Sequence, residues 1–319
     1  MRTSWLLLLG CLATACGGNF SNDDLEFLNA LPAREDLTSK LPGAEGAVSA
    51  GSLRQRSDLL TLGEGSRLYA DTRKASDEFN NGLDRLLTLL EAIRDLPPTR
   101  REPERRIWGP WPDRRHPGHE LRFVMTREAE RFDYQLQFRP ERSGEEAWWT
   151  LVDGSFLAGG GLRKGEGTVK LLLAEARAHG FSVGGLAALE RLDIGYQTRA
   201  LPIGVEMHFV PVFPLVTPEV RYAYREIPGG LGEMRFLLED TDVISGGQKE
   251  DLAIVSRWTR ERGGVGRITV TGGDVPAGAT ATHVECWDAS FRVTYVKRSW
   301  ETTVVGDASA CPDVSELEN

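Results

Sequence analysis

From Trp108 almost to the end of the chain, hydrophobic and polar residues alternate with a period of two. In the clearest run, residues 132–139, four large apolar side chains alternate with four polar ones. Alternation of this kind is typical of a β-strand with one buried and one hydrated face. The pattern recurs at Leu121/Phe123/Met125, Val220/Tyr222/Tyr224, Met234/Phe236/Leu238, Ile268/Val270 and Phe291/Val293/Tyr295.

Turn-forming residues separate these runs. They occur at 142–144, 152–154, 228–230, 263–264 and 276–278. Strands joined by short turns are antiparallel, because a parallel crossover needs a dozen or more residues. The sequence therefore predicts a mainly β fold with helices, in which a large antiparallel β-meander forms a curved open sheet or a half-barrel.

One insertion interrupts the meander between residues 167 and 195. Residues 168–172 continue a strand, and residues 173–179 have the pattern of a short helix that ends before Gly180. Glycine suits this position because it adopts a positive φ without a Cβ clash. The glycine-rich run at 159–167 lacks the residue order of a phosphate-binding loop, so we expect a hairpin loop there.

Residues 66–95 carry the only long helical pattern. Five apolar residues recur at spacings of four and three and form one stripe of a helix, and Pro97-Pro98 ends the run. This stripe predicts that the helix packs on the sheet; pairing with a partner helix in a coiled coil is the alternative, although fewer than three heptads are present. The stripe consists of Phe79, Leu83, Leu86, Leu90 and Ile93.

The amino-terminal segment has the features of an export signal. Arg2 precedes an apolar run from Trp5 to Ala13, which is shorter than the about 20 residues that cross a bilayer. The sequence Ala13-Thr14-Ala15-Cys16 then resembles the lipobox of bacterial lipoprotein precursors, although Ala13 stands where leucine is most common. An ordinary secreted protein cleaved near residue 15 is the alternative.

The resemblance implies that Cys16 is acylated and becomes the first residue of the mature protein. Cys11 also follows a leucine-containing segment, but cleavage there would leave an apolar core of about five or six residues, below the usual 7 to 15. In this family, aspartate directly after the cysteine favours retention in the inner membrane. Gly17 occupies that position, so the resemblance implies an outer-membrane lipoprotein, membrane-bound through its lipid and carrying palmitate.

These observations divide the chain into five parts. We expect a signal peptide at 1–15, a flexible tether with one short helix at 16–65, the long amphipathic helix at 66–98, the antiparallel β domain at 99–305, and a polar tail at 306–319. A tether suits lipid anchoring because it leaves slack between the bilayer and the folded domain.

Removal of the signal leaves three cysteines. If Cys16 carries lipid, Cys286 and Cys311 remain as a pair, and an exported chain reaches an oxidising compartment. We therefore predict a disulfide bond between Cys286 and Cys311 that attaches the tail to a strand. Two unpaired thiols or a metal site are the alternatives.

Charge argues against nucleic acid as a partner. The formal net charge of −9 becomes −10 when the signal, with its single Arg2, is removed. Six arginines do cluster between residues 100 and 115, but acidic residues and prolines interrupt them, and we interpret this stretch as a solvated loop.

No catalytic or metal-binding motif stands out. The histidines are dispersed apart from His116 and His119, for which a loop pair is the simpler interpretation, and the acidic residues near 239–251 lack the spacing of a calcium loop. We accordingly expect no cofactor, no metal and no catalytic set. Trp148 and Trp149 are adjacent in a predicted strand, so their rings should face opposite sides of the sheet.

Two classes of function remain. The first is a non-catalytic envelope lipoprotein that binds another envelope protein, or that carries an apolar ligand in a half-barrel cavity. The second is an exported hydrolase that uses scattered carboxylates. Candidates for such carboxylates are Asp193, Glu206, Glu239 and Glu285.

Overall fold

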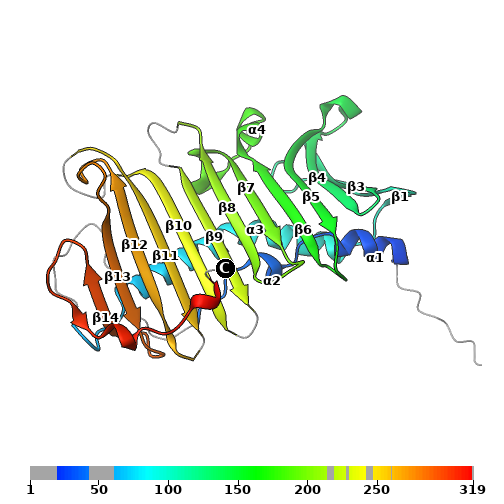
Figure 1. Cartoon of the computed structure of the whole chain (residues 1–319). Helices are drawn as coiled ribbons and strands as arrows, with labels where there is room; N and C mark the ends of the chain where they lie inside the picture. The colour runs from blue at the N-terminus through cyan, green and yellow to red at the C-terminus, as the bar shows by residue number, and fades with distance from the viewer. Residues whose placement is uncertain are drawn as a thin grey trace, which may run out of the picture.

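The computed structural model describes residues 20–42, 61–213, 219–227, 230–241, 247–259 and 261–317. Within these residues, fifteen strands form one sheet, and each strand pairs antiparallel with its neighbours in sequence order (Figure 1). The predicted antiparallel meander is confirmed. Its first and last strands are not paired with each other, so the sheet is open and does not close into a barrel.

The strands are β1 (Arg100–Glu102), β2 (Arg105–Pro112), β3 (His119–Glu128), β4 (Arg131–Pro140), β5 (Trp149–Ala158), β6 (Gly165–Leu172), β7 (Leu189–Gln197), β8 (Ile203–Pro211), β9 (Val220–Ile227), β10 (Leu231–Thr241), β11 (Glu250–Thr259), β12 (Gly263–Gly272), β13 (Ala281–Trp287), β14 (Val293–Arg298) and β15 (Val305–Gly306). The helices are α1 (Asn22–Asn29), α2 (Arg34–Leu37), α3 (Arg67–Arg94) and α4 (Leu173–Ala178), with short 3-10 turns at η1 (Glu145–Ala147), η2 (Gly184–Leu186), η3 (Ala308–Ala310) and η4 (Ser315–Leu317).

The alternation in the sequence gives the sheet two different faces. In β4 every second residue is buried, and the buried residues face the helices. We call this side the inner face and the opposite, hydrated side the outer face. Trp149 is buried on the inner face, whereas Trp148, just before β5, stacks with the guanidinium groups of Arg122 and Arg139. The two rings therefore face opposite sides, as predicted.

Helix α3 covers the inner face. Its predicted apolar stripe is buried, and the helix crosses behind the strands in Figure 1. Ser66 caps its first turn by accepting a hydrogen bond from the backbone N–H of Tyr69 at 3.0 Å. Thr72 shares a hydrogen bond of 2.6 Å with Ser256 of β11. The stripe thus packs on the sheet, as the first interpretation predicted.

The segment 20–42 is not a tether. It contains α1 and α2, and Phe27, Leu31 and Leu37 are at most 1% exposed within the main hydrophobic core. A short helix was predicted here, and α1 confirms it, but the prediction of a flexible segment is wrong for these residues. Their apolar side chains are sufficient to attach the segment to the inner face. Cys16, the signal and residues 43–60 lie outside the described residues.

The arginine-rich stretch is also different from its prediction. Residues Arg100–Glu102 and Arg105–Pro112 are strands β1 and β2, and only Arg114 and Arg115 lie in an exposed turn. Arg106 is 4% exposed and donates to the buried carboxylate of Asp24 at 2.7 Å. The interpretation as a solvated loop is wrong because Asp24 of α1 supplies a counter-ion that offsets the cost of burying the Arg106 guanidinium.

Two smaller predictions are corrected as well. The sequence predicts a turn at residues 152–154, but these residues lie inside β5, where Gly154 leaves room for the ring of Tyr134; a Cβ there would be 2.2 Å from that ring. The sequence pattern predicts a strand that includes Phe291, yet Phe291 has a φ of 61° in the turn before β14 and stacks on Tyr69 with ring centroids 4.1 Å apart. The insertion forms α4, and Gly180 after it has a φ of 79°, as expected.

The carboxyl-terminal tail crosses the outer face. Cys286 of β13 and Cys311 form a disulfide bond, with their Cα atoms 5.3 Å apart. Beyond it, Val314 and Leu317 are buried, and the carbonyl oxygen of Leu317 accepts a hydrogen bond from Arg225 of β9 at 2.8 Å. The predicted disulfide is present, and the polar tail is packed against the sheet at its apolar residues.

We expect the replacement Cys311→Ser to lower the free energy of unfolding by about 3 kcal/mol, because the bond closes a loop of 25 residues and restricts the unfolded chain. Urea denaturation of the oxidised protein and the variant measures the difference. The reduced wild-type protein serves as control and should match the variant. An unchanged midpoint in Cys311→Ser contradicts the prediction.

Candidate functional site

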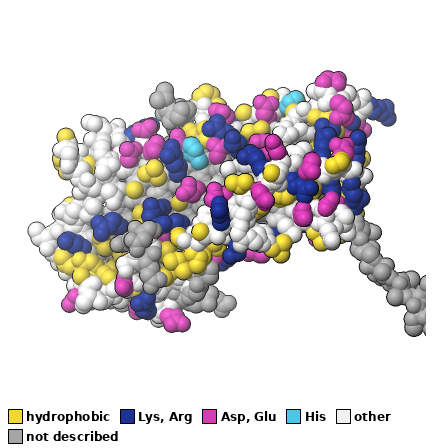
Figure 2. Space-filling view, turned by 45° about the vertical axis from the view of Figure 1, so that its right-hand side comes forward, with side chains coloured by type: hydrophobic (Ala, Val, Ile, Leu, Met, Phe, Trp, Pro, Cys, Tyr) yellow, Lys and Arg dark blue, Asp and Glu magenta, His cyan; other side chains and the backbone are white. Residues whose placement is uncertain are grey.

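A hollow of about 910 Å³ crosses the outer face from β6 to β11. We call it the outer groove. Strand register places Lys170, Asp193, His208 and Arg221 at directly opposed positions on four neighbouring strands, so that they form one row across the groove. Figure 2 shows positive and negative side chains intermixed on this side of the molecule.

Ion pairs fix several of the charged side chains of the groove. Glu219, at the start of β9, contacts His208 at 2.5 Å and Arg221 at 2.6 Å. The Arg221 guanidinium, with a contribution from His208, holds the pKa of Glu219 below its usual range. Asp193 accepts from Arg191 at 2.9 Å. The row therefore contains side chains of both charge types, and ion pairs with neighbours on the same face hold Asp193, His208 and Arg221 in place.

The other end of the groove is apolar. Leu237, Ala253 and Val255 lie on β10 and β11, and Arg235 stands exposed beside them. The groove thus joins an apolar strip to a row of charged side chains. A surface of this composition suits recognition of a partner that is itself partly charged and partly apolar.

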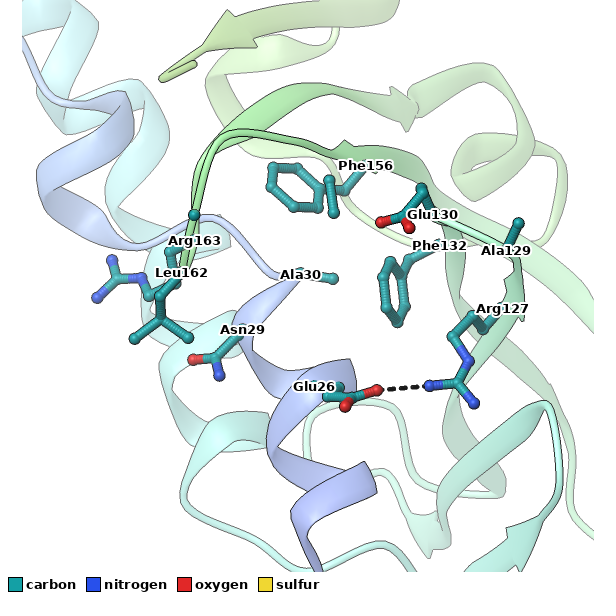
Figure 3. A pocket seen from close by; sticks show the side chains of 12 residues that line it. Glu26, Asn29, Ala30, Arg127, Ala129, Glu130, Phe132, Phe156, Leu162 and Arg163 are labelled. Carbon is teal, nitrogen blue, oxygen red and sulfur yellow. Dashed lines mark hydrogen bonds and ion pairs between the residues drawn. The ribbon is translucent and has the colours of Figure 1, made fainter.

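A second cavity, of about 410 Å³, lies between α1 and the ends of β4 and β5. Figure 3 shows the rings of Phe132 and Phe156 at its base beside Ala30. At its rim, Glu26 of α1 and Arg127 of β3 form an ion pair of 2.6 Å. We call this cavity the α1 cleft. Its rings are at most 6% exposed, so it offers little apolar surface to a ligand.

The carboxylates considered for a hydrolase do not all lie on one face of the sheet. Asp193 and Glu206 line the outer groove, whereas Glu285 lies on the inner face and is 1% exposed. Glu285 accepts from the Ser66 hydroxyl at 2.5 Å and from the Leu68 backbone N–H at 3.3 Å, which places it at the amino-terminal end of α3. Its role in this arrangement is to cap the helix.

Asp71 lies in the second turn of α3, close to Glu285. Burial, with repulsion from the Glu285 carboxylate, raises the pKa of Asp71 from its ordinary value of 3.8 to about 6. The folded state therefore binds this proton more tightly than the unfolded state does. The contribution of protonated Asp71 to stability is complete below pH 3.8 and is lost as the pH rises through 6.

We expect Asp71→Asn to raise the free energy of unfolding by about 2 kcal/mol at pH 8 and to have little effect at pH 4, because the amide cannot ionise. Urea denaturation at both pH values measures this difference. Asp77→Asn, an exposed position on the same helix, is the matched control and should change little at either pH. Equal effects of Asp71→Asn on the free energy of unfolding at pH 4 and pH 8 contradict this prediction.

The remaining candidate groups have structural roles. His116, in the loop before β3, contacts Asp113 at 2.6 Å and stacks on Phe181, and His119 packs against the same ring; His119 is the first residue of β3, so only His116 of the predicted loop pair lies in the loop. Glu250 is buried and accepts from the Asp274 backbone N–H at 2.9 Å. Of the predicted hairpin loop at 159–167, residues 159–164 form the loop between β5 and β6, and residues 165–167 belong to β6. In the part of the chain described, no group of three or more His, Cys, Asp or Glu side chains is placed to hold a metal ion.

The sequence did not reveal the outer groove. Its row of charges comes from four strands, and only their register brings these residues together. The predicted disulfide partners Cys286 and Cys311 do meet, while Cys16 lies outside the described residues. No helix among the described residues is both long and apolar enough to cross a membrane.

Comparison of the chain with the models of known protein families, with curated proteins and with solved structures finds no match.

Proposed function

We propose that this protein is a lipid-anchored lipoprotein of the bacterial cell envelope, held in the membrane through Cys16, with a non-catalytic β domain. The observation that carries this proposal is the lipobox-like sequence Ala13-Thr14-Ala15-Cys16 after a short apolar run. The disulfide adds support: Cys286 and Cys311 pair with each other, which leaves Cys16 as the one cysteine of the processed chain available for acylation.

The proposed location is the outer membrane. Gly17, not aspartate, follows the cysteine, and in the lipoprotein family this favours transport beyond the inner membrane. The disulfide fits an oxidising compartment such as the periplasm.

The proposed activity of the domain is to bind another envelope protein at the outer groove. The groove is open, carries fixed charges of both signs, and borders an apolar strip. A carrier of apolar ligands needs a cavity at the inner face, where α3 side chains already pack on the sheet. A hydrolase needs neighbouring catalytic groups, and the candidate carboxylates are divided between the two faces.

Metabolic labelling with a clickable palmitate analogue tests the anchor. We expect label in the wild-type protein and in Cys11→Ala, and loss of label and of membrane association in Cys16→Ala. The matched cysteine variant separates the two lipobox candidates.

A measurement of the intact mass of the purified native protein is a second test of the anchor. The proposal requires a chain that begins at Cys16 and carries acyl mass. Label retained in Cys16→Ala, or a native protein that begins elsewhere without acyl mass, contradicts the proposal.

A further inference from the structure

The distance between the proposed anchor and the folded domain is short. Only Gly17, Gly18 and Asn19 separate Cys16 from Phe20, which packs against the main core. Four Cα–Cα steps extend to about 14 Å at most. An acylated Cys16 therefore keeps Phe20 close to the bilayer surface. This inference rests on the proposed function.

Helix α1 follows Phe20 and is bonded to the sheet, so the position of Phe20 near the membrane restricts the position of the whole domain. Ser21 and Asp24 form a reciprocal capping box at its start. The Asp24 carboxylate, itself 0% exposed, accepts hydrogen bonds from Arg101 of β1 at 2.9 Å and from Arg106 of β2 at 2.7 Å. Phe27, one turn later, is fully buried. Phe20 and α1, which follow the proposed anchor in the sequence, are thus part of the packed domain.

Helix α1 lies at one end of the row of strands. The first turn of α1 contacts β1 and β2 through Asp24, and Figure 1 shows α1 at the end of the molecule opposite β14. Neighbouring strands are spaced by about 4.8 Å, so fourteen spacings place β15 about 65 Å from β1 along the sheet.

We infer that the bilayer faces the end of the sheet formed by the first turn of α1 and the β1–β2 hairpin, which we call the membrane-proximal edge. The strands of the sheet then lie at increasing distances from the membrane in the order β1 to β15, with β14 and β15 farthest away. The outer groove, on β6 to β11, stands about 25 to 50 Å from the headgroups, where a partner protein can reach it.

The chemistry of the membrane-proximal edge suits the hydrated headgroup zone. Its exposed side chains include charged groups of both signs, since those of Arg100, Asp23 and Glu104 are 70%, 60% and 61% exposed, and one large apolar residue, Leu25, which is 47% exposed. The charged groups do not enter hydrocarbon, but they remain solvated beside polar headgroups. With both signs present at the edge and a net charge of −10 on the processed chain, the lipid anchor rather than a basic patch holds this edge at the membrane.

The test uses the full lipidated chain in vesicles of phosphatidylethanolamine and phosphatidylglycerol that carry a short-range fluorescence quencher on their headgroups. A fluorophore is attached at Pro103→Cys in the β1–β2 turn, or at Thr303→Cys beside β15; both positions are exposed. The native Cys286 and Cys311 are in the disulfide and do not react. We expect loss of fluorescence at position 103 and none at position 303.

Two further variants make the outcome decisive. An insertion of about 20 Gly/Ser residues after Asn19 should abolish the quenching at position 103 while the protein stays on the vesicles, because a flexible linker frees the edge. Cys16→Ala should show no quenching at either position. Quenching of equal strength at 103 and 303 in the bound protein overturns the orientation and leaves the anchor intact. Failure of the wild-type chain to associate with vesicles overturns the proposed function itself.

Discussion

Replacing Asp24 with alanine should lower the free energy of unfolding by about 3 to 5 kcal/mol at pH 7, because it leaves the guanidinium of Arg106 buried without its counter-ion. The same change removes one of two hydrogen bonds of the α1 capping box and one that Arg101 donates to the Asp24 carboxylate. Urea denaturation measures the loss. Asp23→Ala is the matched control, since Asp23 is 60% exposed and lies 3.5 Å from Arg106, and we expect it to cost less than about 1 kcal/mol.

The effect of Asp24→Ala should depend on pH. Burial alone raises the pKa of Asp24, but the backbone N–H of Ser21 and the guanidinium groups of Arg106 and Arg101 outweigh it and lower this pKa from 3.8 to about 2. The ionised carboxylate therefore stabilises the fold above pH 3.8, and this contribution is lost as the pH falls toward 2. The difference in unfolding free energy between wild type and variant should become smaller over that pH range. A gap of constant size from pH 7 to pH 2 is the result that contradicts the assignment.

The sheet and α3 could be predicted because their signals are local. Alternation with a period of two identifies a strand such as β4 within eight residues, and short turns leave the antiparallel meander as the simple arrangement. The stripe of α3 repeats at helical spacing in the same way. The Cys286–Cys311 pair followed from counting cysteines.

The packing of residues 20–42 depends on long-range contacts that no local sequence pattern predicts. Asp24 meets Arg106 across 82 positions, and nothing near either residue identifies the other as its partner. The Ser21-to-Asp24 spacing was a readable sign of a helix start, but it does not say what α1 packs against. The outer groove has the same origin, because its charges come together only through the register of four strands.

Replacing Glu233 with alanine should have the second large effect, a loss of about 3 kcal/mol of unfolding free energy. Glu233 of β10 is 1% exposed, and its carboxylate contacts Arg235 at 2.6 Å, Arg257 at 2.6 Å and Arg225 at 2.8 Å. Without it, three guanidinium groups face one another beneath the carboxyl-terminal tail. Because these groups are 19% to 47% exposed, water compensates part of the loss, which keeps the cost at the lower end for a broken buried pair.

The change should also loosen the tail, since Arg225 joins Glu233 to the carbonyl oxygen of Leu317. Amide hydrogen exchange around η4 should become faster in Glu233→Ala, and limited proteolysis should cut the tail earlier. Burial alone raises the pKa of Glu233, but the guanidinium groups of Arg235, Arg257 and Arg225 outweigh burial and hold this pKa below its ordinary value of 4.5. The ionised carboxylate therefore stabilises the fold above pH 4.5, and this stabilisation is lost as the carboxylate is protonated. Glu206→Ala, an exposed carboxylate on the same face, is the control, and equal losses in the two variants argue against a central role for Glu233.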